Sequence, residues 1–151
     1  MLRKRRSFVI GLLTAVVAVA LLLTAYTVTG GFRSSTVPRT ALIPKDDYYS
    51  ITGGQFNDVA FSVQSTSVVN GTFTNTLGII VYLLTPAQLN YLATKGNVSS
   101  YDWSSGQIPN LEVYDLNVEV ESGQWDLAFV NPSLVNTTVV GFWTDITVGA
   151  S

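Results

Sequence analysis

Hydrophobic and polar residues follow two different patterns along this chain. Residues 8–26 form one apolar run without a charge or a proline. From residue 48 onward, short segments alternate apolar and polar side chains, which is the period of half-buried β-strands. Turn-forming residues separate these segments at intervals of about 8–12 residues. The second pattern predicts an all-β fold, an antiparallel β-sandwich of the jelly-roll type, over residues 48–151.

Individual segments differ in how they alternate. Val59, Phe61 and Val63 face one side and predict a strand with one buried face. Residues 78–85 are almost all apolar, which is typical of a central strand covered on both faces. Residues 137–148 alternate throughout and predict one last strand.

Polar segments between the strands predict turns and loops. Asn70-Gly71 stands between β-branched residues, and this dipeptide favours a two-residue hairpin turn. Ser122-Gly123 and Asn131-Pro132 predict two further turns. Residues 97–110 are rich in Ser and Asn, and we expect them to form a polar loop.

One segment carries the signals of a helix. Thr85 suits the N-cap, Pro86 the first helical position, and Gln88 completes a capping box. The apolar residues that follow fall on one stripe, and Gly96 fits a left-handed C-cap. We expect a short helix that covers one end of the sandwich.

The first apolar run is long enough to cross a bilayer. At 1.5 Å per residue it spans about 28 Å, close to the hydrocarbon thickness. Four cations precede it: Arg3, Lys4, Arg5 and Arg6. Because such clusters stay on the cytoplasmic side, we expect a cytoplasmic tail over residues 1–7, a single transmembrane helix over residues 8–28 and an extracytoplasmic remainder. The predicted location is the cell membrane.

Residues 29–47 contain Gly30, Gly31, Pro38 and Pro44 without a sustained period. Glycine and proline at these intervals predict a linker between the membrane and the domain. Cleavage after Gly30 is an alternative, and it would release a small secreted β-sandwich.

The N-terminal region resembles a known family. A basic cluster, then SFVIGLL and a Val/Ala/Leu-rich run, is similar to the leader and assembly helix of archaeal type IV pilins. The resemblance covers residues 3–20. It implies an alternative function, a filament subunit whose helix packs into a pilus core after the leader is removed.

The C-terminal region carries a second resemblance. The stretch LNVEVESGQWDLAFVNPSLVNTTVVGFWTDITV is similar to the last strands of small extracellular jelly-roll domains, including pre-peptidase-type and Golgi-dynamics-type domains. The shared positions are Gly123, Trp125, Leu127, Phe129 and Asn131. With the basic, apolar N-terminus, the chain resembles small membrane-anchored prokaryotic surface proteins of archaeal type. The resemblance implies a fold, and a fold alone does not give a function.

The absence of certain residue types excludes several classes of function. The chain has 151 residues with no Cys and no His, which excludes disulfides, thiolate chemistry and Ser–His–Asp catalysis. From residue 46 onward, Lys95 is the one basic residue against ten carboxylates, a net charge of −9. A surface of that sign repels phosphate backbones, so no nucleic-acid partner is expected.

Two sets of residues are candidates for surface chemistry. Asn70, Asn97 and Asn136 each begin a glycosylation sequon in an expected turn or loop. Tyr101 and Trp103 flank Asp102, and exposed rings beside polar groups are typical of surfaces that bind proteins or glycans. The alternative for Trp103 is a ring that fills the core beneath its own loop.

No catalytic, metal or cofactor residues are predicted. Asp46 and Asp47 could offer oxygen ligands to Ca²⁺ with Asp102 or Glu112, but no loop has the spacing of a calcium site, and a solvated acidic surface is favoured. A hydrolase would require convergent carboxylates with raised pKa values in a cleft. The sequence therefore predicts a non-catalytic, membrane-anchored binding or accessory domain for a protein or glycan partner outside the cell.

Overall fold

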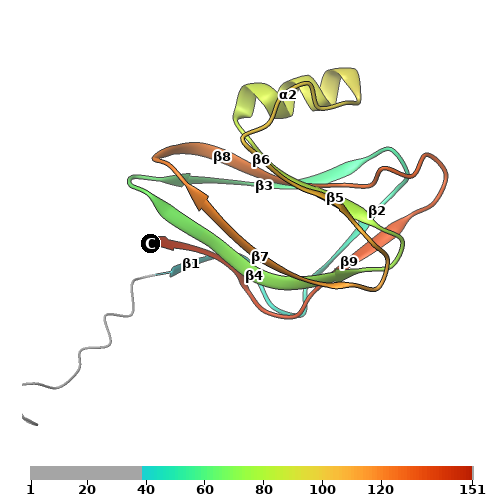
Figure 1. Ribbon diagram of the computed structural model, residues 1–151, viewed down its shortest axis with the longest axis horizontal. Helices are drawn as coiled ribbons and strands as arrows, with labels where there is room; N and C mark the ends of the chain where they lie inside the picture. Colours follow the sequence, from blue (N-terminus) through green and yellow to red (C-terminus); the bar gives the residue numbers. More distant parts are fainter. Residues whose placement is uncertain (1–38, 151) are drawn as a thin grey trace, which may run out of the picture. The chain divides into compact units, whose positions relative to one another are not determined.

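Two antiparallel β-sheets face each other in the computed structural model, which describes residues 39–150 (Figure 1). The first sheet contains β1 (Arg39–Ile43), β2 (Tyr48–Ile51), β4 (Ser67–Asn75), β7 (Val113–Val120), β9 (Thr138–Phe142) and β10 (Ile146–Ala150). The second contains β3 (Phe56–Val63), β5 (Ile79–Leu84), β6 (Trp103–Ile108) and β8 (Gly123–Val130). Every strand pairing among the described residues is antiparallel. The predicted all-β sandwich is confirmed.

The expected tail over residues 1–7, the transmembrane helix over residues 8–28 and the cations Arg3 to Arg6 lie outside the described residues. Within residues 39–150, no helix has both the length and the hydropathy needed to cross a membrane.

The first sheet is built from four lines of strand. β9 and β10 follow one another along the same edge of β4, and β7 pairs with the other edge. β1 pairs with β10, and β2 pairs with β9, so these two strands form a fourth line. The second sheet has the order β3-β8-β5-β6. Each sheet thus presents four lines, and most connections pass from one sheet to the other.

The last strand and the linker both differ from expectation. Residues 143–145 interrupt the expected strand over residues 137–148, and residues 44–47 interrupt its neighbour at the same level. The two breaks hold each other, because Asp46 N–H donates to Phe142 O at 2.9 Å and Lys45 N–H donates to Asp145 Oδ1 at 2.6 Å. The linker expected over residues 29–47 is wrong for residues 39–43, because these form β1 and pair with β10, which covers the edge of that strand. Residues 29–38 lie outside the described part of the chain.

Asn70-Gly71 lies in the middle of β4, so the expected hairpin turn there is wrong. Gly71 passes the break between β9 and β10, where a Cβ would lie 2.5 Å from Ile146 Cδ1 and 2.7 Å from Asp145 O. The glycine serves a close approach between strands rather than a chain reversal. Asn70 Oδ1 accepts a hydrogen bond from Thr147 Oγ1 at 2.8 Å.

Residues 97–110 are not wholly a loop, because Trp103–Ile108 form the edge strand β6. Its pairing with β5 shifts register between Ile80 and Tyr82. Ser105 Oγ accepts the Val81 N–H at 2.9 Å, so a side chain satisfies a donor of β5 beside this irregularity. Polar residues and an irregular register hide a strand from any argument based on strict alternation.

The helix α2 (Pro86–Lys95) begins and ends as predicted. Thr85 and Gln88 form the capping box, and Gly96 adopts φ 70° as the C-cap. Its position differs from expectation. The helix covers the outer face of the second sheet rather than one end of the sandwich, because Leu92 packs against Leu84 of β5 and Ala128 of β8 (Figure 1).

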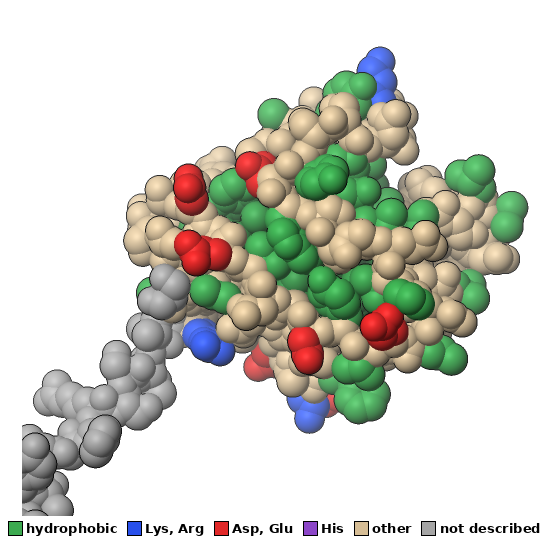
Figure 2. Space-filling model, in the orientation of Figure 1, with side chains coloured by type: hydrophobic (Ala, Val, Ile, Leu, Met, Phe, Trp, Pro, Cys, Tyr) green, Lys and Arg blue, Asp and Glu red, His purple; other side chains and the backbone are tan. Residues whose placement is uncertain are grey.

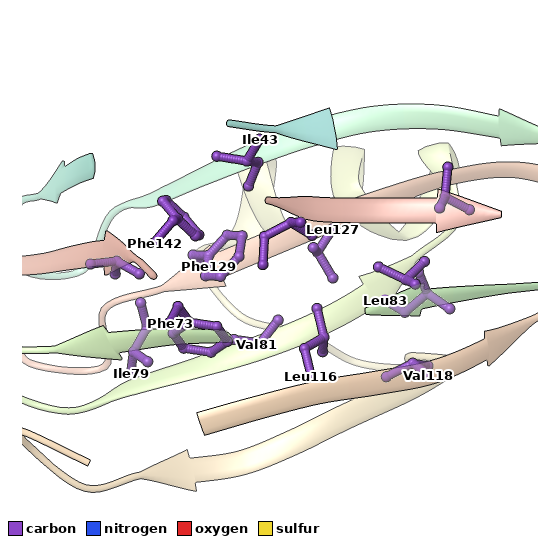
Figure 3. Packing of buried hydrophobic residues seen from close by; sticks show 14 of the residues in the cluster. Ile43, Phe73, Ile79, Val81, Leu83, Leu116, Val118, Leu127, Phe129 and Phe142 are labelled. Carbon is purple, nitrogen blue, oxygen red and sulfur yellow. The ribbon is translucent and has the colours of Figure 1, made fainter. Parts of the chain in front are cut away.

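The core between the sheets centres on aromatic rings. Phe73 of the first sheet contacts Phe129 of the second edge-to-face, with ring centroids 5.4 Å apart. Phe129 also meets Phe142 at 5.5 Å, and Tyr49 meets Phe142 at 5.2 Å. Figure 3 shows Phe73, Phe129 and Phe142 beside Val81, Leu116 and Leu127. These contacts join the inner faces of both sheets.

Gly71 and Gly141 provide a matched test of the first sheet. We expect Gly71→Ala to lower the free energy of unfolding by about 1–3 kcal/mol, because the new methyl group overlaps Ile146 and Asp145. Gly141→Ala has nothing within 4 Å of its new methyl group, so its effect should stay within about 0.5 kcal/mol. Urea denaturation of the full-length protein measures both, and equal effects would contradict this role of Gly71.

Candidate functional site: the loop end of the sandwich

Four loops meet at one end of the sandwich. They are residues 52–55, 76–78, 109–112 and 131–137, and we call them together the loop end. Backbone hydrogen bonds join them in pairs: Gly54 N–H donates to Asn131 O at 3.2 Å, and Leu111 N–H donates to Asn75 O at 2.7 Å. The first and last described residues, Arg39 and Ala150, lie at the opposite end (Figure 1).

Asn131 holds the first pair of loops from inside. It is only 1% exposed. Its Nδ2 donates to Ile51 O at 2.9 Å and to Asn136 O at 2.7 Å, and its Oδ1 accepts the Ser133 N–H at 3.0 Å. One buried amide therefore satisfies backbone groups at the end of β2 and on both sides of the 131–137 loop.

Asn75 plays the same part for the second pair. It is also only 1% exposed. Its Nδ2 donates to Pro109 O at 3.0 Å, and its Oδ1 accepts the Gly78 N–H. The loop between β4 and β5 and the loop between β6 and β7 are thus fixed to each other through one side chain.

The tips of these loops carry aliphatic side chains in water. The exposed fractions are 50% for Leu77, 73% for Leu111, and 86% for both Leu134 and Val135. Glu112 is the one charged residue in the four loops. Figure 2 shows hydrophobic side chains protruding on the right, where the loop between β8 and β9 lies in Figure 1. Clustered apolar tips on a rigid base are typical of a binding surface.

Leu111 adds a strained backbone to this end. Its φ is 59°, a conformation that residues other than glycine, asparagine and aspartate seldom adopt. The hydrogen bond from Leu111 N–H to Asn75 O holds the residue there while its side chain stays in solvent. Such strain concentrates at functional sites.

The structure does not bring Tyr101 and Trp103 into one surface. Tyr101 is 55% exposed, and its ring lies 5.4 Å from Tyr82, which packs beside α2 on the outer face of the second sheet. Trp103 is half-buried and packs against the core on the inner face, as the alternative prediction had it. A contact role for either ring stays a prediction.

Trp103 also lines a cleft at the end where β7 leads into β8. The cleft has a volume of about 470 Å³, with Trp125 on its wall and Asp102, Glu119 and Glu121 around it. Trp125 Nε1 donates to Glu121 O at 2.9 Å, which fixes that ring. No group of three or more His, Cys, Asp or Glu side chains among residues 39–150 is arranged to hold a metal ion.

The three sequons differ in their surroundings. Asn97 follows α2 and Asn136 belongs to the loop end, and both are exposed. Asn70 is half-buried within β4, so its expected place in a turn is wrong, and Thr147 and Arg39 both donate to its Oδ1. Glycosylation of these residues stays a prediction.

The four exposed aliphatic residues of the loop end were not singled out by sequence reasoning. One signal in the sequence could have identified them, namely apolar residues inside segments that form turns, as in Pro132-Ser133-Leu134-Val135. A leucine in a surface turn has no neighbouring element to bury it. Comparison of the chain with protein-family models and with curated proteins finds no match.

We expect Asn131→Ala to lower the free energy of unfolding by about 2–4 kcal/mol, because it leaves two carbonyls and one N–H without their partner. Amide exchange at Gly54 should quicken at the same time. Asn136→Ala in the same loop is the control, since its side chain is exposed. Equal losses in the two variants would show that Asn131 does not organise the loop end.

Proposed function

We propose that this protein is a non-catalytic, membrane-anchored binding domain that uses its loop end to contact a protein partner outside the cell. The observation that carries the proposal is the set of four exposed aliphatic side chains on loops fixed by Asn75 and Asn131. A surface that is already ordered loses little conformational entropy on binding, so its apolar area contributes more fully to affinity.

The chemistry of these tips favours a protein over a glycan. Sugar hydroxyls lose hydrogen bonds to water on binding and need polar partners in return. Leu77, Leu134 and Val135 offer none, whereas they suit an apolar pocket on a protein. The ectodomain's negative charge further favours a partner whose surface is neutral or basic.

The geometry of the domain fits an N-terminal tether. Arg39 lies at the end of the sandwich opposite the loop end. A chain that reaches the domain from an anchor over residues 8–28 joins it at that end and leaves the loop end free. The same argument applies to a filament subunit, so the processing of the N-terminus separates the two alternatives.

We also propose that the sandwich is a jelly roll. With its eight strand lines numbered in chain order, the first sheet has the order 1-8-3-6 and the second 2-7-4-5. Two Greek keys wound together produce this interleaved order. The long alternation between sheets is also what collects four loops at one end.

Intact mass and N-terminal sequencing of the protein from its native membrane test the anchor. A chain that starts at Met1 or Leu2 supports a retained anchor. A start at Ser7 would indicate leader removal and filament assembly, and a start near Gly31 would indicate a released domain. Excess mass would show that sequons are used.

Photo-cross-linking tests the loop end. A cross-linking side chain at Leu134 should give one discrete protein adduct in native membranes, whereas the same group at Gln64, an exposed residue near the opposite end, should give none. Wild-type protein without a cross-linker should compete for that partner and reduce the adduct, whereas the double variant Leu134→Ser, Val135→Ser should not compete. The variant should change stability by no more than about 0.5 kcal/mol. Equal adducts from both positions would argue against the proposal. Glycan binding that depends on Tyr101 would argue for a different partner.

A further inference from the structure

A second hollow lies between α2 and the outer face of the second sheet. It has a volume of about 730 Å³, within the usual range for small-ligand sites. Its apolar walls include Phe56, Leu89 and Ala93, and its polar groups include Asp58 and Asp126. The outer face of β3 carries the small residues Ala60 and Ser62 there, which leaves room beside the helix. We call this hollow the helix groove.

Asp126 is the unusual residue of the helix groove. It is 4% exposed and lies on β8 between Ala60 of β3 and Leu84 of β5. Among the described residues, none donates a hydrogen bond to its carboxyl group, and no side-chain oxygen there is both fully buried and unpaired. The carboxyl oxygens therefore open into the groove, which they line. A carboxylate in such surroundings needs a partner that this part of the chain does not supply.

Asp58 lies near Asp126, but it is also acidic and cannot neutralise the charge of the Asp126 carboxylate. It lies on β3 opposite Ala128, on the same face as Asp126 and diagonal to it across the strand pair, at about 7–8 Å in typical sheet geometry. Burial raises the pKa of Asp126, and repulsion from Asp58 raises it further. No Lys or Arg lines the groove. Two carboxyl groups thus share an apolar hollow with no counter-ion from the described residues.

We propose that the helix groove binds an organic cation, an ammonium or guanidinium group carried on an apolar stem. Asp126 and Asp58 receive the charged group through charge-assisted hydrogen bonds. Leu89 and Phe56, which pack on the outer face of the second sheet, contact the stem. A metal ion fits poorly, because the groove offers two carboxylates and otherwise mostly apolar walls.

A pair of matched probes tests the proposal on the full-length protein. Pentan-1-amine should shift the Asp126 carboxyl and Leu89 methyl signals in NMR spectra, and pentan-1-ol at the same concentration should not. Asp126→Asn should weaken binding of the amine by about tenfold or more, which corresponds to about 1.4 kcal/mol. Asp58→Asn should weaken it by a smaller factor, since that residue is exposed.

Glu119→Gln is the control, because this exposed carboxylate lies on β7 of the other sheet and should leave amine binding unchanged. Equal shifts with the alcohol, or full binding by Asp126→Asn, would overturn the proposal. Nα-acetyl-lysine methylamide then distinguishes the source of the cation. Tighter binding than pentan-1-amine indicates the lysine side chain of a partner polypeptide, and weaker binding indicates a free amine.

The same variant makes a prediction about stability. The pKa of Asp126 is raised in the folded state, so the contribution of its protonated form is lost as pH rises through that value. We therefore expect Asp126→Asn to match the wild type in free energy of unfolding at acidic pH and to exceed it increasingly toward neutral pH. Asp58 is the carboxyl group that faces Asp126 in the groove, and the lining residues of α2 are not ionisable. On β5, Leu84 lies opposite Asp126 and Tyr82 lies diagonal to it; burial raises the pKa of Tyr82, so this phenol stays neutral over the pH range of the test. Urea denaturation across this pH range checks the trend, and a difference independent of pH would contradict it.

Discussion

The edge-to-face contact between Phe73 and Phe129 is the interaction on which the rest of the sandwich depends. It joins a central strand of each sheet, and Phe142, the register partner of Phe73, and Tyr49 extend it across the first sheet. Because rings of this kind fill the space between sheets and prefer this geometry, they fix how the two inner faces meet. The register of every neighbouring strand then decides which residues reach solvent.

The loop end shows how that core supports an otherwise unfavourable surface. Exposed leucines and a residue at φ 59° are each costly, and neither helps the domain to fold. Two buried asparagines hold them in place by satisfying backbone groups of adjacent loops. Proteins usually bury apolar side chains and expose polar ones, whereas the loop end buries two asparagines and exposes aliphatic side chains. This reversal is the physical reason for treating the loop end as a candidate site.

Local signals predicted the parts of the fold that depend on local physics. The capping residues of α2 and the alternation in β3, β7 and β8 act within a few residues of themselves, so the sequence alone identified them. The errors share a different cause. Gly71 is required by its close approach to Ile146, and β6 is a strand because it pairs with β5. The position of α2 depends on the small side chain of Ala128, which leaves space on β8. The candidate site was missed for the same reason, since Asn75 also bonds to Pro109 and Asn131 also bonds to Ile51, which are residues distant in sequence.

The position of β1 has a mechanical consequence. Its antiparallel hydrogen bonds with β10 run across the strand direction, and Arg39 is its first residue. Tension between an N-terminal tether at Arg39 and a load on the loop end would act along the strands and stretch these bonds in shear. All of them then share the force, instead of opening one after another as in a peeled hairpin. A first strand paired in this way resists being pulled out of its sheet by a force along its own direction.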